Sequence, residues 1–291
     1  MKKCSIISLF IFLESLSICA QVPNTVIYVA DLEFNREHVQ LRNFEKIKVA
    51  PGYNNQPEFG PSGRIYFTAI ADEKQADVYY YDESNKKNVQ VTYSNESEYS
   101  PTPYGNNQLS FVSVDMDSAQ RFYDLNLLTH KKTLLMPDED SIGYFQWLNE
   151  HTIVYFCLGN PVTLKLYNSI DNSMNVIDTS VGRCFGTHPI HRQLTYTLKR
   201  NNEVFIMMYN SENGKSSWVC KALEGSEDYA WLNDGSLLMG SNGSLYRLNP
   251  MLDNAWKKVA SLENEVGNFY RIKVNALGNR IALVAYEGEK P

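Results

Sequence analysis

The chain has 291 residues, of which 43% are hydrophobic and 12% aromatic, and 33 acidic side chains against 27 basic ones give it a net charge of −6. A chain with this excess of acid has too few cations to neutralise a phosphate backbone, so nucleic acid is excluded as the expected partner. Its many aromatic and β-branched residues, interrupted by Asn, Asp, Ser and Gly, favour one all-β domain.

The first twenty residues have the pattern of a secretory signal peptide. Lys2 and Lys3 precede a short apolar run over residues 5–13, and the small residue Ala20 marks the expected cleavage site. The run is shorter than the roughly 20 apolar residues that a membrane-spanning helix needs. We therefore expect an exported protein, periplasmic or secreted, whose mature domain covers residues 21–291 and has no transmembrane segment.

The cysteines do not indicate a disulfide framework. Cys19 lies where a lipid-modified cysteine would sit, but Ile18 is bulkier than the residue such sites prefer, so a lipoprotein is the less favoured alternative. Removal of the leader leaves an odd number of cysteines, Cys157, Cys184 and Cys220. We expect these to be thiols in strands or in the core, with at most one bridge.

One element recurs along the mature chain: a polar lead-in, a short strand, a tight turn and an apolar strand. The first apolar residue after each turn marks the copies, and these residues are Ile65, Leu109, Ile153, Leu194, Leu237 and Ile281. The spacings between them are 44, 44, 41, 43 and 44 residues. Six copies fit the chain.

Each copy except the last continues with a strand that ends in Asp or Asn and with a fourth apolar segment. The strand ends are Asp82, Asn126, Asn168, Asn210 and Asn249. The fourth segments begin at Val89, Lys132, Asn175, Trp218 and Trp256. Four strands per unit is the content of a propeller blade, so the sequence predicts a six-bladed β-propeller with four-stranded antiparallel blades.

The sixth copy ends at Tyr286 after two strands, so the last blade needs two further strands from the N-terminal part of the chain. Strand-like segments that begin at Thr25 and Lys46 are the expected completion. This closure would leave no exposed sheet edge. The residues between them, Glu33 to Glu45, are expected to form a surface loop.

The first copy contains QPEFGPSG from Gln56, with a proline, an aromatic residue and a Ser-Gly turn, and Asp234-Gly235 gives the fifth copy a similar turn. In these features the sequence resembles the TolB-like (PD40, WD40-like) propellers. The period matches over nearly all of the mature chain, the signature letters over one or two copies. The resemblance implies a six-bladed ring with a central channel, in a family that mostly binds proteins or peptides at the cell envelope.

Residues that suggest catalysis are sparse. His188 and His191 fall at one tight turn with no third His or Cys, so we interpret them as turn residues rather than metal ligands. Asp115 and Asp117 lack the glycine of a calcium loop and are expected to be solvated loop acids. No G-x-S-x-G nucleophile motif occurs. The sequence thus predicts a non-enzymatic module with no cofactor and no metal.

One alternative stays open, a metal-dependent lactonase- or lyase-like enzyme that uses the central channel. Such a site needs acids and amides from several blades, and Glu58, Asn149 and Asn275 are the residues that would contribute. Trp147 and Trp231 occupy equivalent places before their turns and are expected to pack between blades rather than to stack on a ligand.

Acidic residues gather in the connections from the fourth strand of one copy to the first strand of the next, which emerge at the channel mouth in this fold. They are Glu96, Glu98, Asp138, Glu139, Asp140, Glu224, Glu227, Asp228, Glu263 and Glu265, against Arg183 as the one basic residue of these connections. We predict that they form a partner-binding face for a basic peptide or an envelope protein, the alternative being the ordinary polarity of loops in an acidic protein.

Overall fold

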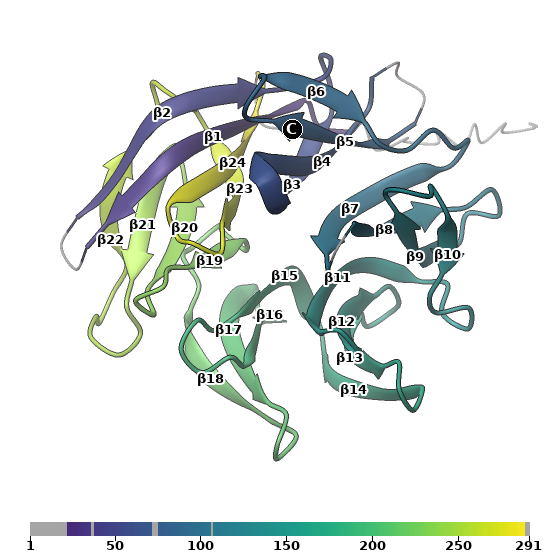
Figure 1. The fold of residues 1–291 in the computed structure, drawn as a ribbon. Helices are drawn as coiled ribbons and strands as arrows, with labels where there is room; N and C mark the ends of the chain where they lie inside the picture. Colours follow the sequence, from purple (N-terminus) through teal and green to yellow (C-terminus); the bar gives the residue numbers. More distant parts are fainter. Residues whose placement is uncertain (1–21, 36–37, 72–74, 106, 289–291) are drawn as a thin grey trace, which may run out of the picture.

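The computed structural model describes residues 22–35, 38–71, 75–105 and 107–288, so the predicted signal peptide (residues 1–20) lies outside the described residues. Within them the chain forms six four-stranded antiparallel sheets, arranged as blades around a ring (Figure 1). A single 3₁₀ turn, Pro61–Gly63, interrupts the described strands. The predicted all-β six-bladed propeller is confirmed.

Five blades are each built from four consecutive strands. Blade 1 contains β3 (Asn54–Phe59), β4 (Arg64–Ala69), β5 (Asp77–Asp82) and β6 (Lys87–Gln90), and blade 2 contains β7 (Ser97–Tyr104), β8 (Gln108–Val114), β9 (Gln120–Asn126) and β10 (Lys132–Leu134). Blade 3 contains β11 (Ile142–Asn149), β12 (Thr152–Cys157), β13 (Thr163–Asn168) and β14 (Ser173–Thr179). Blade 4 contains β15 (Val181–Thr187), β16 (Leu194–Arg200), β17 (Glu203–Asn210) and β18 (Lys215–Lys221), and blade 5 contains β19 (Tyr229–Trp231), β20 (Leu237–Ser241), β21 (Ser244–Leu248) and β22 (Lys257–Ser261).

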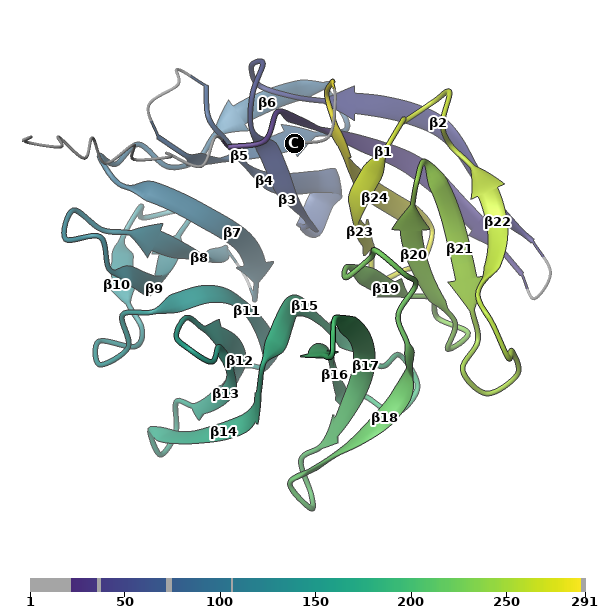
Figure 2. The ribbon, with the colours of Figure 1, turned by 180° about the vertical axis from the view of Figure 1, so that it is seen from behind.

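Blade 6 joins the two ends of the described chain. Its inner strands are β23 (Phe269–Val274) and β24 (Arg280–Tyr286), and its outer strands are β1 (Thr25–Phe34) and β2 (Val39–Ile47), in the order β2-β1-β24-β23. The purple β1 and the yellow β24 lie side by side in both views (Figures 1 and 2). The predicted closure by N-terminal strands is confirmed.

The loop predicted over Glu33 to Glu45 is wrong. The outer hairpin of blade 6 runs through this segment, since β1 continues to Phe34 and β2 begins at Val39. Val39 is 3% exposed and belongs to the core between blades 5 and 6. The strand could not be recognised in the sequence because the outer face of β2 is exposed and charged. Few apolar residues are left to show the alternation of apolar and polar side chains that is typical of a strand.

The hydrophobic core lies between blades. Six apolar clusters each join two neighbouring blades, and together they run around the ring. The six residues that mark the repeat are each the first or second residue of a second strand and are between 0% and 3% exposed. Successive side chains alternate between two buried faces, as Tyr79 and Tyr81 pack toward blade 6 while Tyr80 packs toward blade 2.

The Asp or Asn at the end of each third strand caps the following turn. Its Oδ1 accepts a hydrogen bond from the backbone N–H two residues later, at 2.9 Å for Asp82, 3.0 Å for Asn126, 2.9 Å for Asn168, 2.8 Å for Asn210 and 3.0 Å for Asn249. These are Asx turns, which explains why only Asp and Asn occupy the position.

The two tryptophans hold neighbouring blades together, as predicted. Trp147 of blade 3 donates from Nε1 to Ser110 Oγ of blade 2 at 3.0 Å, and Trp231 of blade 5 donates to Thr195 Oγ1 of blade 4 at 2.9 Å. The three described cysteines are free thiols in strands, also as predicted. Over the described ranges, no helix has the length and apolar character needed to cross a bilayer.

Candidate binding site at the channel mouth

The two faces of the ring carry different loops. The connections between blades share one face with the turns between second and third strands, because residues 222–227 and 240–242 line the same cavity. We call this the connection face. The opposite face carries the other turns, including residues 188–191 and 249–252.

A cavity of about 150 Å³ lies on the axis of the ring. The inner strands β3, β7, β11, β15, β19 and β23 contribute side chains or backbone to its wall, with Asp228 just before β19. On one side of it Lys273 forms an ion pair with Glu58 at 2.5 Å. The channel is therefore narrow and polar, and every blade reaches it.

Two arginines share one carboxylate in this channel. Arg271 of β23 donates from Nε to Asp228 Oδ2 at 3.0 Å, and Arg183 of β15 donates from Nε to Asp228 Oδ1 at 3.3 Å. The Asp228 side chain is only 5% exposed. Blades 4, 5 and 6 each contribute one member of this cluster, so no local sequence pattern reveals it.

The partners of Arg271 hold it in place. Its Nη1 donates to Asn55 Oδ1 at 3.0 Å, and Asn55 Nδ2 donates in turn to the hydroxyl of Tyr270 at 2.5 Å. Its guanidinium lies 5.7 Å from the centre of the Tyr144 ring. Burial disfavours the charge of Arg271, but Asp228 and the surrounding tyrosines outweigh it and raise its pKa.

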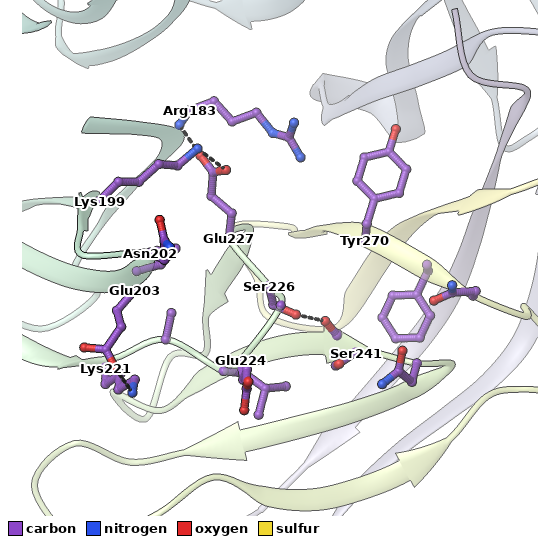
Figure 3. Close-up of a pocket in the computed structure, with 18 of the residues that line it drawn as sticks. Arg183, Lys199, Asn202, Glu203, Lys221, Glu224, Ser226, Glu227, Ser241 and Tyr270 are labelled. Carbon is purple, nitrogen blue, oxygen red and sulfur yellow. Dashed lines mark hydrogen bonds and ion pairs between the residues drawn. The ribbon is translucent and has the colours of Figure 1, made fainter. Parts of the chain in front are cut away.

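Two larger pockets flank the channel on the connection face. One, of about 440 Å³, lies among blades 4, 5 and 6, and its lining is drawn in Figure 3. The other, of about 540 Å³, lies between blades 3 and 4. Arg183, Lys199 and Glu227 line both pockets, and Arg183 also lines the channel. The three cavities therefore meet at Arg183.

Half of the ten predicted acids are engaged inside the protein. Glu96 pairs with Lys132 at 2.5 Å, Glu139 with Lys165 at 2.7 Å, Glu227 with Lys199 at 2.8 Å and Asp228 with the two arginines, while Glu98 is 1% exposed and accepts from Thr92 Oγ1 at 3.0 Å. The sequence counted Arg183 as the one basic residue of these connections, but it lies in β15, and lysines from neighbouring strands pair with the acids.

Glu139 also differs from the solvated loop acid that the sequence suggested. Its side chain is buried and accepts hydrogen bonds from Lys165 Nζ at 2.7 Å and from the Tyr155 hydroxyl at 2.9 Å. Burial disfavours its charge, but these two donors outweigh burial and lower the pKa of Glu139. The position of an acid in a connection does not by itself show whether its side chain is buried.

The other five acids are exposed and form no salt bridge with any residue that the structure describes. They are Asp138, Asp140, Glu224, Glu263 and Glu265, which we call the rim acids. They belong to the connections that lead into blades 3, 5 and 6. A negative rim thus surrounds a centre in which two arginines share one carboxylate.

The residues considered for metal chemistry have structural roles. His188 Nδ1 accepts from the backbone N–H of Ile190 at 3.2 Å, and its ring packs on Trp231, which confirms it as a turn residue. Asp115 and Asp117 both pair with Arg121, so Asp115, whose side chain is 10% exposed, is not the solvated acid expected.

A divalent metal does not fit the channel as built. Its two carboxylates, Glu58 and Asp228, are each already bound to cationic side chains. Asn149 and Asn275 use their Oδ1 atoms to accept backbone N–H groups of their own turns. Within the described ranges, no three His, Cys, Asp or Glu side chains gather in a way that would hold a metal.

No protein-family model and no curated protein matches this sequence. Solved structures do resemble it. A putative TolB from Agrobacterium tumefaciens has a TM-score of 0.65 at 9% identity, over 92% of this chain and 99% of that one. TolB from Acinetobacter baumannii has a TM-score of 0.59 at 10% identity, over 91% of this chain. The fold is that of the TolB-like propellers.

This chain spans only 65% of the length of the Acinetobacter baumannii TolB. An oligogalacturonate lyase in complex with manganese shares the fold as well, with a TM-score of 0.54 at 13% identity over 80% of this chain and 77% of that one. The TolB-like fold therefore confirms the predicted resemblance in architecture, while proteins of different function share it.

Proposed function

We propose that this protein is an exported, non-enzymatic TolB-like propeller that binds a protein segment or peptide on its connection face. The observation that carries the proposal is the meeting of three cavities at Arg183, which gives that face an extended row of adjoining hollows. An extended peptide needs such an elongated surface, whereas a small substrate needs one enclosed pocket.

The rim acids suit a basic partner. Asp138, Asp140, Glu224, Glu263 and Glu265 are exposed at the connections and form no salt bridge with a described residue, so their field extends into solvent. Such a field raises the association rate of a cationic segment and fades as salt rises. The engaged acids Glu96, Glu98, Glu139, Glu227 and Asp228 support this face by fixing the loops and the central arginines.

The competing proposal, a metal-dependent lactonase- or lyase-like enzyme, has weaker support. The oligogalacturonate lyase that shares the fold is described with manganese. In this chain, however, Asp228 and Glu58 are bound to arginine and lysine side chains, and a metal would have to displace them. We therefore assign binding rather than catalysis to the channel mouth.

The proposal is tested by capturing partners from an envelope extract with the mature protein and measuring the affinity of each purified candidate. Neutralising two rim acids, Asp138→Asn and Asp140→Asn, should slow association and flatten its salt dependence. The matched control neutralises Glu150 and Glu212, which are exposed on the opposite face. Equal losses from both pairs would leave only a bulk-charge effect, and turnover of a lactone or an oligogalacturonate by the protein would refute a non-enzymatic role.

A further inference from the structure

Arg183 has hydrogen-bond donors that the protein itself does not use. Its Nε contacts Asp228 at 3.3 Å, but neither Nη atom donates to any residue in the described ranges. The side chain is 36% exposed, against 14% for Arg271, whose Nε and Nη1 are both occupied. In Figure 3 the guanidinium extends away from Glu227 and toward Tyr270.

The charge around Arg183 is also incomplete. Lys199, Lys165 and Lys132 each neutralise one carboxylate on the connection face. Arg183 and Arg271 have one between them, Asp228, so the ion pairs at the junction of the cavities leave one positive charge unmatched, while the rim acid Glu224 also lines the 440 Å³ pocket. An anion bound there would accept hydrogen bonds from the Nη atoms of Arg183.

A second donor faces the same space. The Tyr270 ring lies 5.7 Å from the Arg183 guanidinium and lines the neighbouring pocket of about 440 Å³. The Tyr270 hydroxyl accepts from Asn55 at 2.5 Å, which leaves its own proton free to donate. Two guanidinium N–H groups and one phenol are donors of the kind that bind a planar carboxylate.

We propose that Arg183 binds a carboxylate of the peptide that the connection face takes up, an assignment that rests on the proposed function. The negative rim and the positive centre together select a ligand whose carboxylate is flanked by basic side chains. The carboxylate would come from an Asp or Glu side chain or from the chain terminus, and the probes below separate these two sources.

The experiment titrates purified mature protein with short peptides and follows the Arg183 Nε–Hε signal by NMR. The probes are acetyl-Lys-Glu-Lys-amide, its Gln counterpart, and acetyl-Lys-Lys with a free or an amidated C-terminus. We expect a carboxylate-bearing probe to shift the signal and the counterparts without a carboxylate to leave it unchanged. A shift with the Glu peptide identifies a side-chain carboxylate, and a shift with only the free C-terminus identifies a terminal one.

Variants then assign the contact. Arg183→Gln should weaken binding of the carboxylate probe by about tenfold or more, the loss of a charge-assisted hydrogen bond. Arg183→Lys keeps the charge but not the planar fork and should also bind more weakly, and it serves if the Gln variant is unstable. Lys132→Gln is the matched control: it removes one positive charge from the same face, but from a lysine that is already paired with Glu96 and lines none of the three cavities, so its effect should stay below about threefold.

Several outcomes would overturn the assignment. They are the absence of any shift with every carboxylate peptide, equal binding of the Glu and Gln peptides, equal losses in the Arg183 and Lys132 variants, or binding of oligogalacturonate in place of the peptides. If the Arg183→Gln variant binds a captured envelope partner as tightly as the unmodified protein does, the binding function stands and only the role of Arg183 is refuted.

Discussion

Arg271 in the innermost strand of blade 6 donates from Nε to Asp228 of blade 5 at 3.0 Å, across a blade boundary, where the Arg271 side chain is 14% exposed and that of Asp228 5%. The same carboxylate holds Arg183 of blade 4. One acid therefore links three consecutive blades at the channel mouth, and it couples the stability of the ring to the geometry of the candidate site.

Replacing this acid with its amide tests the coupling. Asp228→Asn would leave two arginines with no charge partner at a buried position, which typically costs about 3–5 kcal/mol. We expect the urea midpoint to fall accordingly, with the slope unchanged. Asp138→Asn, an exposed rim acid in another connection, is the control and should change stability by less than about 0.5 kcal/mol. Equal, small effects of both substitutions would mean that the cluster does not join the blades.

A second prediction concerns Glu98, which the sequence placed in the connection before blade 2 but which lies at the start of β7 and is 1% exposed. Burial raises its pKa to about 7, although hydrogen bonds from Ser94 and Thr92 partly oppose this. The folded-state pKa thus lies above the unfolded one, so the stabilising contribution of protonated Glu98 is complete below pH 4.5 and is lost as the pH rises through about 7.

Glu98→Gln should remove this dependence. The amide keeps an oxygen to accept from Thr92, and we expect the variant to be more stable than the unmodified protein at pH 8 by about 3 kcal/mol at most, with little difference at pH 4.5. Urea unfolding of both proteins at several pH values gives the measurement. Glu224→Gln, at an exposed acid of the same face, should give no difference that varies with pH.

The fold could be predicted because its determinants recur. The residues equivalent to Ile65 repeat about every 43 positions and each lies at the start of a buried second strand, as its first or second residue, while the acids and amides equivalent to Asn126 repeat as caps of the third-strand turns. Both signals are local, so one sequence suffices to read them. The hairpin from Phe34 to Val39 escaped prediction because only the two ends of β2, Val39 and Ile47, are buried and the residues between them show no regular alternation.

The site could be predicted only in part. The connection face was located from the repeat register, but which acids turn inward depends on cations in other strands, such as Lys165 for Glu139. The meeting of Arg183, Asp228 and Arg271 comes from three blades and requires the curvature of the ring. A buried arginine near the start of the sixth copy was the one available signal, since charged residues on inner strands are expensive to bury without a partner.

The Asx turns give a third prediction. Asn126 Oδ1 accepts from the backbone N–H groups of Leu128 at 3.0 Å and Thr129 at 2.9 Å. Asn126→Ala should destabilise the protein by about 1 kcal/mol, because two amides lose their partner. Asn126→Asp should be nearly neutral, as Asp82 has the same role in blade 1. A stability loss for Asp as large as for Ala would show that the carboxamide, rather than the acceptor oxygen, is what the turn requires.

The last prediction concerns the contact between blades 5 and 6, where Gly240 of β20 meets the ring of Phe269 of β23. A Cβ atom at position 240 would lie 2.2 Å from Phe269 Cε2, far inside van der Waals contact, and Phe269 is 1% exposed in the core of this boundary. Gly240→Ala should therefore cost about 1–3 kcal/mol through overpacking.

Phe269→Leu alone should also destabilise the protein, because it leaves a cavity. In the double variant the smaller leucine makes room for the methyl group. Its loss of stability should therefore be smaller than the sum of the two single losses by about 1 kcal/mol or more. Urea unfolding of the four proteins measures this coupling. Strictly additive losses would mean that Gly240 is required for a reason other than the approach of Phe269.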